Sequence, residues 1–326
     1  MIQAIAGIDI SKDTFDVTIL RENNKAYKKF TNDTKGFLKL DEWLKKQNLT
    51  KIHACMEATG QYGEKAATYL YQQEHEVSVV NPVRIKAYGN SKLRRNKTDK
   101  ADSQLIAEYC LREKPALWSP SPADFKDLQA LVRRYDDLQV NYRQEMNCLK
   151  SGYDTPYVLE DIRDHAEKLK QRMKDIKEEI IQHIKNSPEL QIQHKLLTSI
   201  IGIGDLTAAK IMGEVRSFSD FTSARQLAAY AGLTPRNFFS GTSVHKKSRI
   251  SKTGNRHLRK ALYMAAISAK KHNPIIRAFC ERLISNGKCP KEAVCAAMRK
   301  LLHISYGVLK SGKPFDPNYL NSIISS

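Results

Sequence analysis

The chain has 326 residues, and its 54 Lys and Arg against 35 Asp and Glu give a formal net charge of +19. With 41% hydrophobic residues it can build folded cores, and its length suits two or three domains. The basic surplus favours a polyanionic partner, nucleic acid before an anionic membrane surface.

The composition also limits where the protein works. No apolar run approaches the roughly 18 residues that a membrane-spanning helix needs, and the start lacks a signal-peptide pattern. The six cysteines form no CxxC pair, which argues against a zinc finger and predicts free thiols. We therefore expect a cytoplasmic protein, associated with the nucleoid, that has no contact with a membrane.

Residues 1–115 alternate strand and helix signals. Apolar or alternating segments predict strands, and 3–4 spacing of apolar residues predicts helices. The expected strands are 4–9, 15–20, 27–30, 52–56 and 77–80, with helices at 34–47 and 62–74. This order predicts an α/β domain with a mixed sheet.

Residues 116–194 have a heptad pattern on both sides of a break that contains Gly152 and Pro156. The pattern predicts two long helices in an antiparallel, coiled-coil hairpin. Either an intramolecular hairpin or a dimerisation arm would fit this spacing. Glu145 interrupts the apolar seam and is a candidate partner contact.

Residues 195–326 are predicted to form a mainly helical domain, with a polar, basic loop at 234–253. Near its start, Gly202 and Gly204 form a Gly-Ile-Gly turn between two helices. Glycines allow a tight turn, and the free amides at the start of the next helix can bind a phosphate. The segment fits a helix-hairpin-helix motif or a plain interhelical turn.

Four carboxylates are candidates for a shared metal site. Asp9 ends the first strand, Glu57 follows the strand 52–56, and Asp99 and Asp102 are three residues apart on one face of a helical turn. Such oxygen ligands select Mg²⁺ or Mn²⁺, which can stabilise the attacking and leaving oxygens of phosphoryl transfer. The alternative is that each is a surface charge or a helix cap.

Two basic segments are candidates for binding a phosphate backbone. Arg94, Arg95 and Lys97 lead directly into the Asp99–Asp102 pair, although a charge run can also be a solvated face. Residues 236–260 hold eight Lys or Arg and no acid. The candidates in this second segment are Lys246, Lys247, Arg249, Lys252 and Arg256. Ser240 lies in the same segment, beside Gly241, and surrounding cations would favour its action as a nucleophile.

Several motifs together resemble the IS110 family of transposases, in its IS1111 branch. In the amino-terminal part these are Gly7-Ile8-Asp9, Glu57-Ala58-Thr59-Gly60 and Thr98-Asp99-Lys100-Ala101-Asp102. In the carboxy-terminal part they are Ile201-Gly202-Ile203-Gly204, the segment 226–235, Ser240-Gly241 and the segment 250–256. Ile201 departs mildly from the family, where many members have Pro.

The resemblance implies a RuvC-like, RNase H-type first domain in which Asp9, Glu57, Asp99 and Asp102 bind Mg²⁺. It implies that Ser240 attacks DNA and forms a covalent phosphoserine intermediate; Ser243 is the alternative nucleophile. It also implies a structured noncoding bridge RNA that pairs with donor and target DNA. The family works as a homo-oligomer, a dimer or a tetramer, in which the acids and the serine meet across protomers.

We therefore expect an RNA-guided DNA transposase of an insertion sequence. A site-specific DNA invertase of the same family shares every motif. A nuclease of the Holliday junction resolvase type would use the same acids with water as the nucleophile. A non-catalytic DNA- or RNA-binding protein would use only the basic surface.

Overall fold

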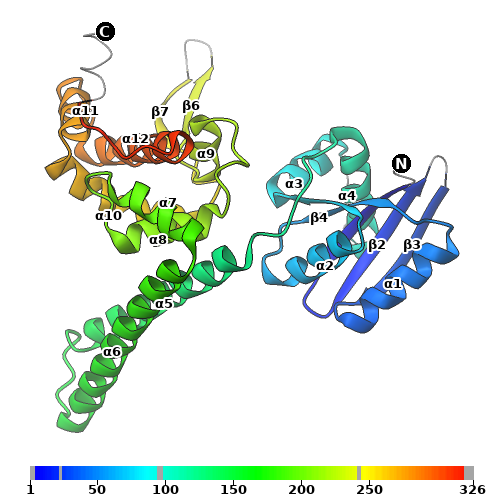
Figure 1. Ribbon diagram of the computed structural model, residues 1–326, viewed down its shortest axis with the longest axis horizontal. Coiled ribbons are helices and arrows are strands. Elements are labelled where there is room, and N and C mark those ends of the chain that lie inside the picture. Colours follow the sequence, from blue (N-terminus) through cyan, green and yellow to red (C-terminus); the bar gives the residue numbers. More distant parts are fainter. Residues whose placement is uncertain (1–3, 22–23, 94–97, 241–243, 319–326) are drawn as a thin grey trace. The chain divides into compact units, whose positions relative to one another are not determined.

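The computed structural model describes residues 4–21, 24–93, 98–240 and 244–318 (Figure 1). The chain divides into two compact units, residues 1–120 and 121–326, and each is described by itself. A mixed α/β unit is followed by a mostly helical one, which confirms the predicted fold class at this level.

The first unit is built on one five-stranded sheet in the order β3-β2-β1-β4-β5. β1, β2 and β3 form an antiparallel meander, whereas β4 and β5 run parallel to β1. The strands are β1 (Ala4–Ile10), β2 (Thr14–Arg21), β3 (Asn24–Thr31), β4 (Ile52–Glu57) and β5 (Glu76–Val80). β3 is therefore an edge strand, and β1 lies in the middle of the sheet.

Helices cover both faces of this sheet and form a separate core on each. α1 (Thr34–Lys46) and α2 (Gln61–Gln72) pack on one face with Phe15 and Leu40. α3 (Pro82–Ser91) and α4 (Asp99–Glu113) pack on the other with Cys55 and Ile106. Because the strands β1, β4 and β5 are covered on both faces, they read as nearly apolar runs, whereas the edge strand β3 is polar and mostly exposed.

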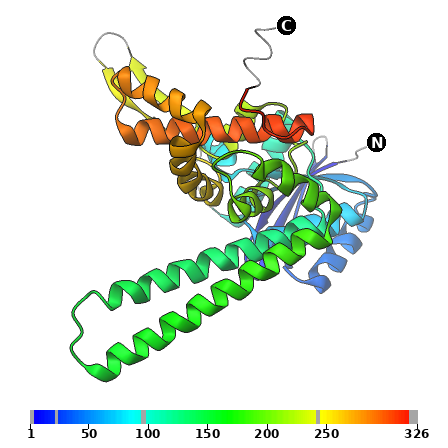
Figure 2. The same cartoon turned by 60° about the vertical axis from the view of Figure 1, so that its left-hand side comes forward.

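The second unit begins with a long helical hairpin, seen side-on in Figure 2. α5 (Ala123–Cys148) and α6 (Pro156–Asn186) lie side by side, and the break predicted near Gly152 is the connection between them. Apolar seam residues such as Leu138 and Leu169 are buried between the helices. Glu145 lies in this seam and contacts His165 of α6, with 3.1 Å between Oε1 and Nδ1.

The remaining helices share one core with the near ends of α5 and α6. They are α7 (Pro188–Thr198), α8 (Asp205–Val215), α9 (Ala224–Tyr230), α10 (Arg256–His272), α11 (Pro274–Ser285) and α12 (Pro290–Ser311). Across the described ranges, no helix is both long and apolar enough to cross a membrane. The six cysteines are free thiols, as predicted.

The prediction of a loop at 234–253 is wrong, because most of this segment forms a β-hairpin. β6 (Pro235–Ser240) and β7 (Val244–Ile250) pair antiparallel, with a register shift between Arg236 and Phe238. Basic and polar residues recur along both strands, so the alternation that marks a half-buried strand is missing from the sequence. The backbone ladder still forms, since antiparallel pairing does not depend on side-chain polarity.

Candidate active site

A row of charged residues crosses the sheet of the first unit near the carboxyl end of β1. Asp9 lies opposite Asp16 in the β1–β2 pair, and Asp16 lies opposite Lys29 in the β2–β3 pair. Glu57 stands beside Asp9 on β4, because the residues that precede them pair with each other. Residues at one level of neighbouring strands face the same side. We call Glu57, Asp9, Asp16 and Lys29 the charged row.

The charged row lies on the face of the sheet that α4 covers. A Cβ atom on Gly7 would lie 2.1 Å from the carbonyl oxygen of Ser103, so only glycine allows α4 to approach β1 this closely. Cys55 on β4 packs in the core cluster that α4 shares. Because side chains alternate along a strand, Asp9 and Glu57, two residues further on, face the same helix.

The start of α4 brings two more carboxylates to this face. Thr98 caps the helix, its Oγ1 accepting a backbone N–H of the first turn at 3.2 Å. Asp99 and Asp102 both belong to that first turn. Lys29 Nζ lies 3.3 Å from Asp99 Oδ2 and 3.4 Å from Asp16 Oδ2, so one ammonium group joins α4 to the charged row.

Asp16 is the residue that the sequence analysis missed. It is only 3% exposed, and the Tyr27 hydroxyl donates a hydrogen bond to Oδ1. This hydrogen bond, with burial and the nearby carboxylates, raises the pKa of Tyr27 to about 12. The pKa of Lys29 is also raised, first by the Asp16 charge. The available signal was the position of Asp16 between the core residues Phe15 and Val17, which turns it to the α4 side.

The donor chemistry of this face fits a divalent cation. All the candidate ligands offer carboxylate oxygens, which Mg²⁺ and Mn²⁺ prefer. Among the residues that the structure describes, however, no three His, Cys, Asp or Glu side chains are gathered closely enough to hold an ion. The positive charge between Asp16 and Asp99 is supplied by Lys29.

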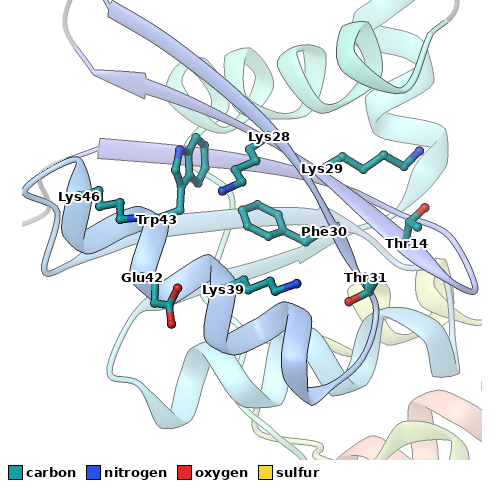
Figure 3. A pocket seen from close by; sticks show the side chains of 9 residues that line it. All are labelled: Thr14, Lys28, Lys29, Phe30, Thr31, Lys39, Glu42, Trp43 and Lys46. Carbon is teal, nitrogen blue, oxygen red and sulfur yellow. The ribbon is translucent and has the colours of Figure 1, made fainter.

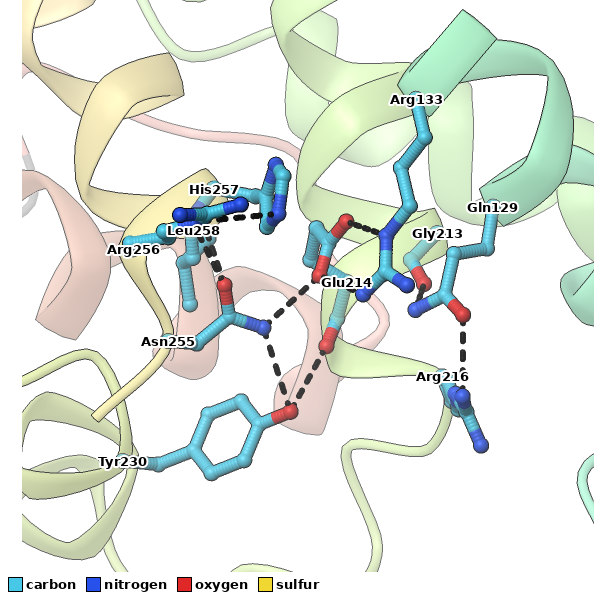
Figure 4. A network of polar contacts seen from close by, with 10 residues as sticks. All are labelled: Gln129, Arg133, Gly213, Glu214, Arg216, Tyr230, Asn255, Arg256, His257 and Leu258. Atoms are coloured by element: carbon cyan, nitrogen blue, oxygen red, sulfur yellow. Dashed lines mark hydrogen bonds and ion pairs between the residues drawn. The ribbon is translucent and has the colours of Figure 1, made fainter. Parts of the chain in front are cut away.

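The second unit holds a buried polar network around Glu214 on α8 (Figure 4). Glu214 is 1% exposed, and Arg133 of α5 donates to both carboxylate oxygens at 2.8 and 3.0 Å. Asn255 Nδ2 donates to Oε2 at 2.8 Å. Burial by itself would raise the pKa of Glu214, but the bonds from Arg133 and Asn255 outweigh it and lower the pKa.

This network anchors the segment that follows the β6–β7 hairpin. Asn255 Oδ1 accepts the backbone N–H groups of His257 and Leu258, at 2.9 and 3.0 Å, and so caps α10. Gly254 has φ +142°, and a Cβ there would lie 2.3 Å from the carbonyl oxygen of Tyr230. The Tyr230 hydroxyl donates to the Glu214 carbonyl at 3.1 Å. The Gly-Asn pair of the motif at 250–256 therefore serves packing and capping.

The two glycines of the predicted phosphate-binding turn differ in role. Gly202 has φ +107° and packs against α10, since a Cβ there would lie 2.5 Å from Ala269 Cβ. Gly204 precedes α8 and is exposed, and a Cβ there would meet no atom within 4 Å. Only the second glycine therefore leaves open space at the amino end of a helix.

The other predicted site residues belong to exposed segments or are not described. Ser240 ends β6 and its backbone pairs with Val244. Arg249, Lys252 and Arg256 are exposed on β7, after it and at the start of α10. Outside the described residues lie Arg94, Arg95, Lys97 and Ser243, together with the side chains of Ser240, Lys246 and Lys247.

Two family models match the chain, one over the first unit and helix α5 and the other within the rest of the second unit. The model of the DEDD-type IS110 domain, described as "Transposase", matches residues 6–155. The model described as "Transposase IS116/IS110/IS902 family" matches residues 194–281. Both describe transposases, which places the chain in a class of DNA-recombining enzymes.

Similar proteins extend the match to nearly the whole chain. The pilin gene-inverting protein of Moraxella lacunata is 37% identical over 322 residues, covering 97% of this chain and 98% of the relative. The relative of the same description from Moraxella bovis has the same identity and coverage. The transposase of IS1111A from Coxiella burnetii is 26% identical over 299 residues, 82% of this chain and 78% of the relative. The chain belongs to the IS110 family of transposases and gene-inverting recombinases.

Proposed function

We propose that this protein exchanges DNA strands by joining them transiently to Ser240, with the carboxylates of the first unit holding the scissile phosphate. The observation that carries the proposal is the register that sets Glu57, Asp9 and Asp16 side by side beneath the start of α4. The antiparallel meander followed by two parallel strands supports the RuvC-like, RNase H-type fold that the family resemblance implies.

In this proposal Asp9, Glu57, Asp99 and Asp102 would hold Mg²⁺ or Mn²⁺. A bound ion of this kind supplies charge that stabilises the pentavalent phosphorus and the leaving oxygen. Asp16 and Lys29 act through Asp99: Tyr27 and Lys29 hold the buried Asp16, and the same lysine reaches the exposed Asp99. Asp16 and Lys29 are thus positioning residues for the first turn of α4.

The chemical step transfers a phosphoryl group without net hydrolysis. The Ser240 oxygen bonds to phosphorus, the bond from phosphorus to one deoxyribose oxygen breaks, and that oxygen leaves as a hydroxyl with the proton that the serine gives up. A deoxyribose hydroxyl of another strand then attacks the phosphoserine and releases Ser240. Lys246, Lys247 and Arg249 would offset the charge on phosphorus.

Nucleic acid is held by groups on both units in this scheme. Arg94, Arg95 and Lys97 would follow the phosphate backbone toward the acids, and the open amino end of α8 at Gly204 would bind one phosphate. Lys252 and Arg256, which lie on either side of the segment that Asn255 anchors, would also contact the phosphate backbone. A bridge RNA would choose the sites by base pairing, and the α5–α6 hairpin would join protomers into a dimer or tetramer.

Inversion of a DNA segment is the outcome that the similarities favour. The pilin gene-inverting proteins match nearly end to end at 37% identity, whereas the transposase of IS1111A matches 82% of the chain at 26%. Transposition of an insertion sequence remains the second candidate, because strand exchange is the same chemistry in both.

The test is a reaction with two recombination sites on one plasmid, with and without the flanking noncoding RNA and Mg²⁺. We expect an inverted product and a protein–DNA adduct, both lost in Ser240→Ala and retained in Ser243→Ala. Full recombination by Ser240→Ala would refute the serine assignment. Nicked DNA without any adduct would instead support the resolvase mechanism with water as nucleophile.

A further inference from the structure

A groove of about 510 Å³ lies between the edge strand β3 and the helix α1 (Figure 3). Four lysines line it and a single carboxylate, Glu42, opposes them. The lysines are Lys28, Lys29, Lys39 and Lys46. The groove therefore has a net positive charge. It shares Lys29 with the charged row and lies outside every basic segment that the sequence analysis assigned.

The fold fixes the residues that line this groove. Lys28 and Phe30 are two residues apart on β3 and share its α1 side. Residues 39, 42, 43 and 46 form one face of α1, since they follow the i, i+3, i+4, i+7 spacing. Phe30 and Trp43, with ring centroids 5.6 Å apart, form the floor and are 5% and 8% exposed. An apolar floor with cationic walls results.

The lysines on the walls are available for a ligand. Lys28, Lys39 and Lys46 form no ion pair within the part of the chain that the structure describes, and Lys28 Nζ lies 5.5 Å from the centre of the Phe30 ring. Among the described residues that line the groove, no charged side chain is buried. A buried charge at the base would have selected a small anion. Exposed ammonium groups along an open groove suit a chain of phosphates, which they bind without reading sequence.

Lys29 links the groove to the charged row. Lys29 lines the groove and also contacts Asp16 and Asp99 on the opposite side of β3. Neighbouring strands are about 4.8 Å apart, so β3 lies about 10 Å from Asp9 on β1, which is about three base-pair rises along the axis of B-form DNA. A strand that leaves the acids over the edge of the sheet therefore meets Lys29 and then the groove.

We propose that the β3–α1 groove binds the backbone of the DNA strand that flanks the scissile phosphate. The proposal rests on the proposed function only in taking the charged row as the place of reaction. The ligand is a run of DNA phosphodiesters, and the lysines hold it without base contacts. Lys29 marks the point where the strand crosses from one face of the sheet to the other.

The first test measures DNA binding without any cleavage. In an Asp9→Asn background, the triple variant Lys28→Ala, Lys39→Ala, Lys46→Ala is compared by fluorescence anisotropy at several salt concentrations. Each lost lysine–phosphate contact lowers the slope of log K against log salt by about 0.7 on a single strand and about 0.9 on a duplex. We expect weaker binding and a slope reduced by about 2 on a single strand and by nearly 3 on a duplex.

A matched control carries the same change of charge elsewhere on the unit. Lys45→Ala, Lys51→Ala, Lys65→Ala removes three exposed lysines that do not line the groove. Equal loss of binding in both triple variants would overturn the proposal, as would no loss in the groove variant. An RNA of the same length is a third arm, and a change confined to RNA would overturn the assignment to DNA. The failure of strand exchange would leave this measurement unaffected.

The second test uses the floor of the groove as a reporter. The chain has two tryptophans, Trp43 in the groove and Trp118 elsewhere on the unit. In a Trp118→Phe protein, a DNA strand over the groove should change the emission of Trp43 and shield it from iodide. Binding of DNA that leaves both the emission and the iodide quenching unchanged would place the strand elsewhere.

Discussion

At the scale of single residues, the first unit depends on a shared lysine. Lys29 is half exposed, yet it contacts the buried Asp16 and the exposed Asp99 at once. Removing Asp16 would leave Lys29 with Asp99 alone, and the lysine would lose the buried carboxylate that fixes its ammonium group between the charged row and α4. Because Asp16 is buried and hydrogen-bonded, its loss affects stability as well as position.

Asp16→Asn should therefore lower the free energy of unfolding by about 1–2 kcal/mol, the range for a charged hydrogen bond discounted for the exposed lysine. Recombination should fall further than this loss explains, because Lys29 no longer has Asp16 to fix its position beside Asp99. Urea unfolding and the inversion assay measure the two effects. Asp13→Asn, an exposed change in the adjoining turn, is the control and should alter neither.

Glu214 plays the corresponding part in the second unit. Glu214→Gln removes the charge that Arg133 binds, and because the Arg133 side chain is 42% exposed the loss should be about 1.5–3 kcal/mol, the range for hydrogen bonds to a charged group. The pKa of Glu214 is lowered below its ordinary 4.5, so its contribution is present above pH 4.5 and is lost as the pH falls through the folded value. The stability difference between wild type and variant should thus shrink below pH 4.5. A constant difference from pH 3 to 7 would contradict this assignment.

At the scale of elements, the β6–β7 hairpin is held from its base. Ser251 N–H donates to the carbonyl of Thr234 at 2.9 Å, and Lys252 N–H donates to that of Gly232 at 3.1 Å. Gly254 packs against Tyr230, and Asn255 caps α10 and reaches Glu214. The β6–β7 hairpin, whose first strand ends at Ser240, therefore depends on contacts made by α8, α9 and α10.

Gly254→Ala should destabilise the base of the hairpin by more than the backbone conformational penalty alone. The added Cβ would lie 2.3 Å from a carbonyl oxygen, whereas at Gly287, which also has positive φ, it would meet nothing within 4 Å. Gly287→Ala should cost about 1 kcal/mol, the usual penalty for a side chain at such a position. Thermal unfolding should show a clearly larger loss for Gly254→Ala, and equal losses would show that the contact with Tyr230 is unimportant.

At the scale of the whole molecule, the proposed chemistry is shared between two compact units. The carboxylates belong to residues 1–120 and Ser240 to residues 121–326, and each unit has its own core. A protomer could therefore supply acids to the serine of another. The long α5–α6 hairpin, with its exposed far end, suits such an assembly.

Mixing two inactive variants tests this division of labour. Asp9→Asn lacks a carboxylate and Ser240→Ala lacks the nucleophile, so each alone should be inactive. If the two groups meet across protomers, a mixture assembled together should contain complete sites and recover strand cleavage and a protein–DNA adduct that neither variant gives alone. No recovery, with mixed oligomers shown by mass, would place both groups in one protomer.

The local elements of this protein follow from its sequence. Period-2 and 3–4 spacing predicted the strands, the hairpin helices and the positions of Asp9 and Glu57, because periodicity is set by the geometry of the backbone itself. The motifs around Asp9, Glu57 and Asp99 also pointed to the IS110 family. These inferences use residues that are neighbours along the chain.

Only the tertiary structure decided which distant residues meet. Strand register places Asp16 and Lys29 in line with Asp9 and Glu57. Gly202 is needed because α10 packs against it. The β6–β7 hairpin forms by backbone hydrogen bonding although its sequence is polar. The groove beside Trp43 likewise exists because α1 folds back along β3. Each of these features depends on a contact between segments far apart along the chain. Such a contact is stabilised by packing and hydrogen bonding in the folded protein, and it imposes no repeating pattern on the sequence of either segment.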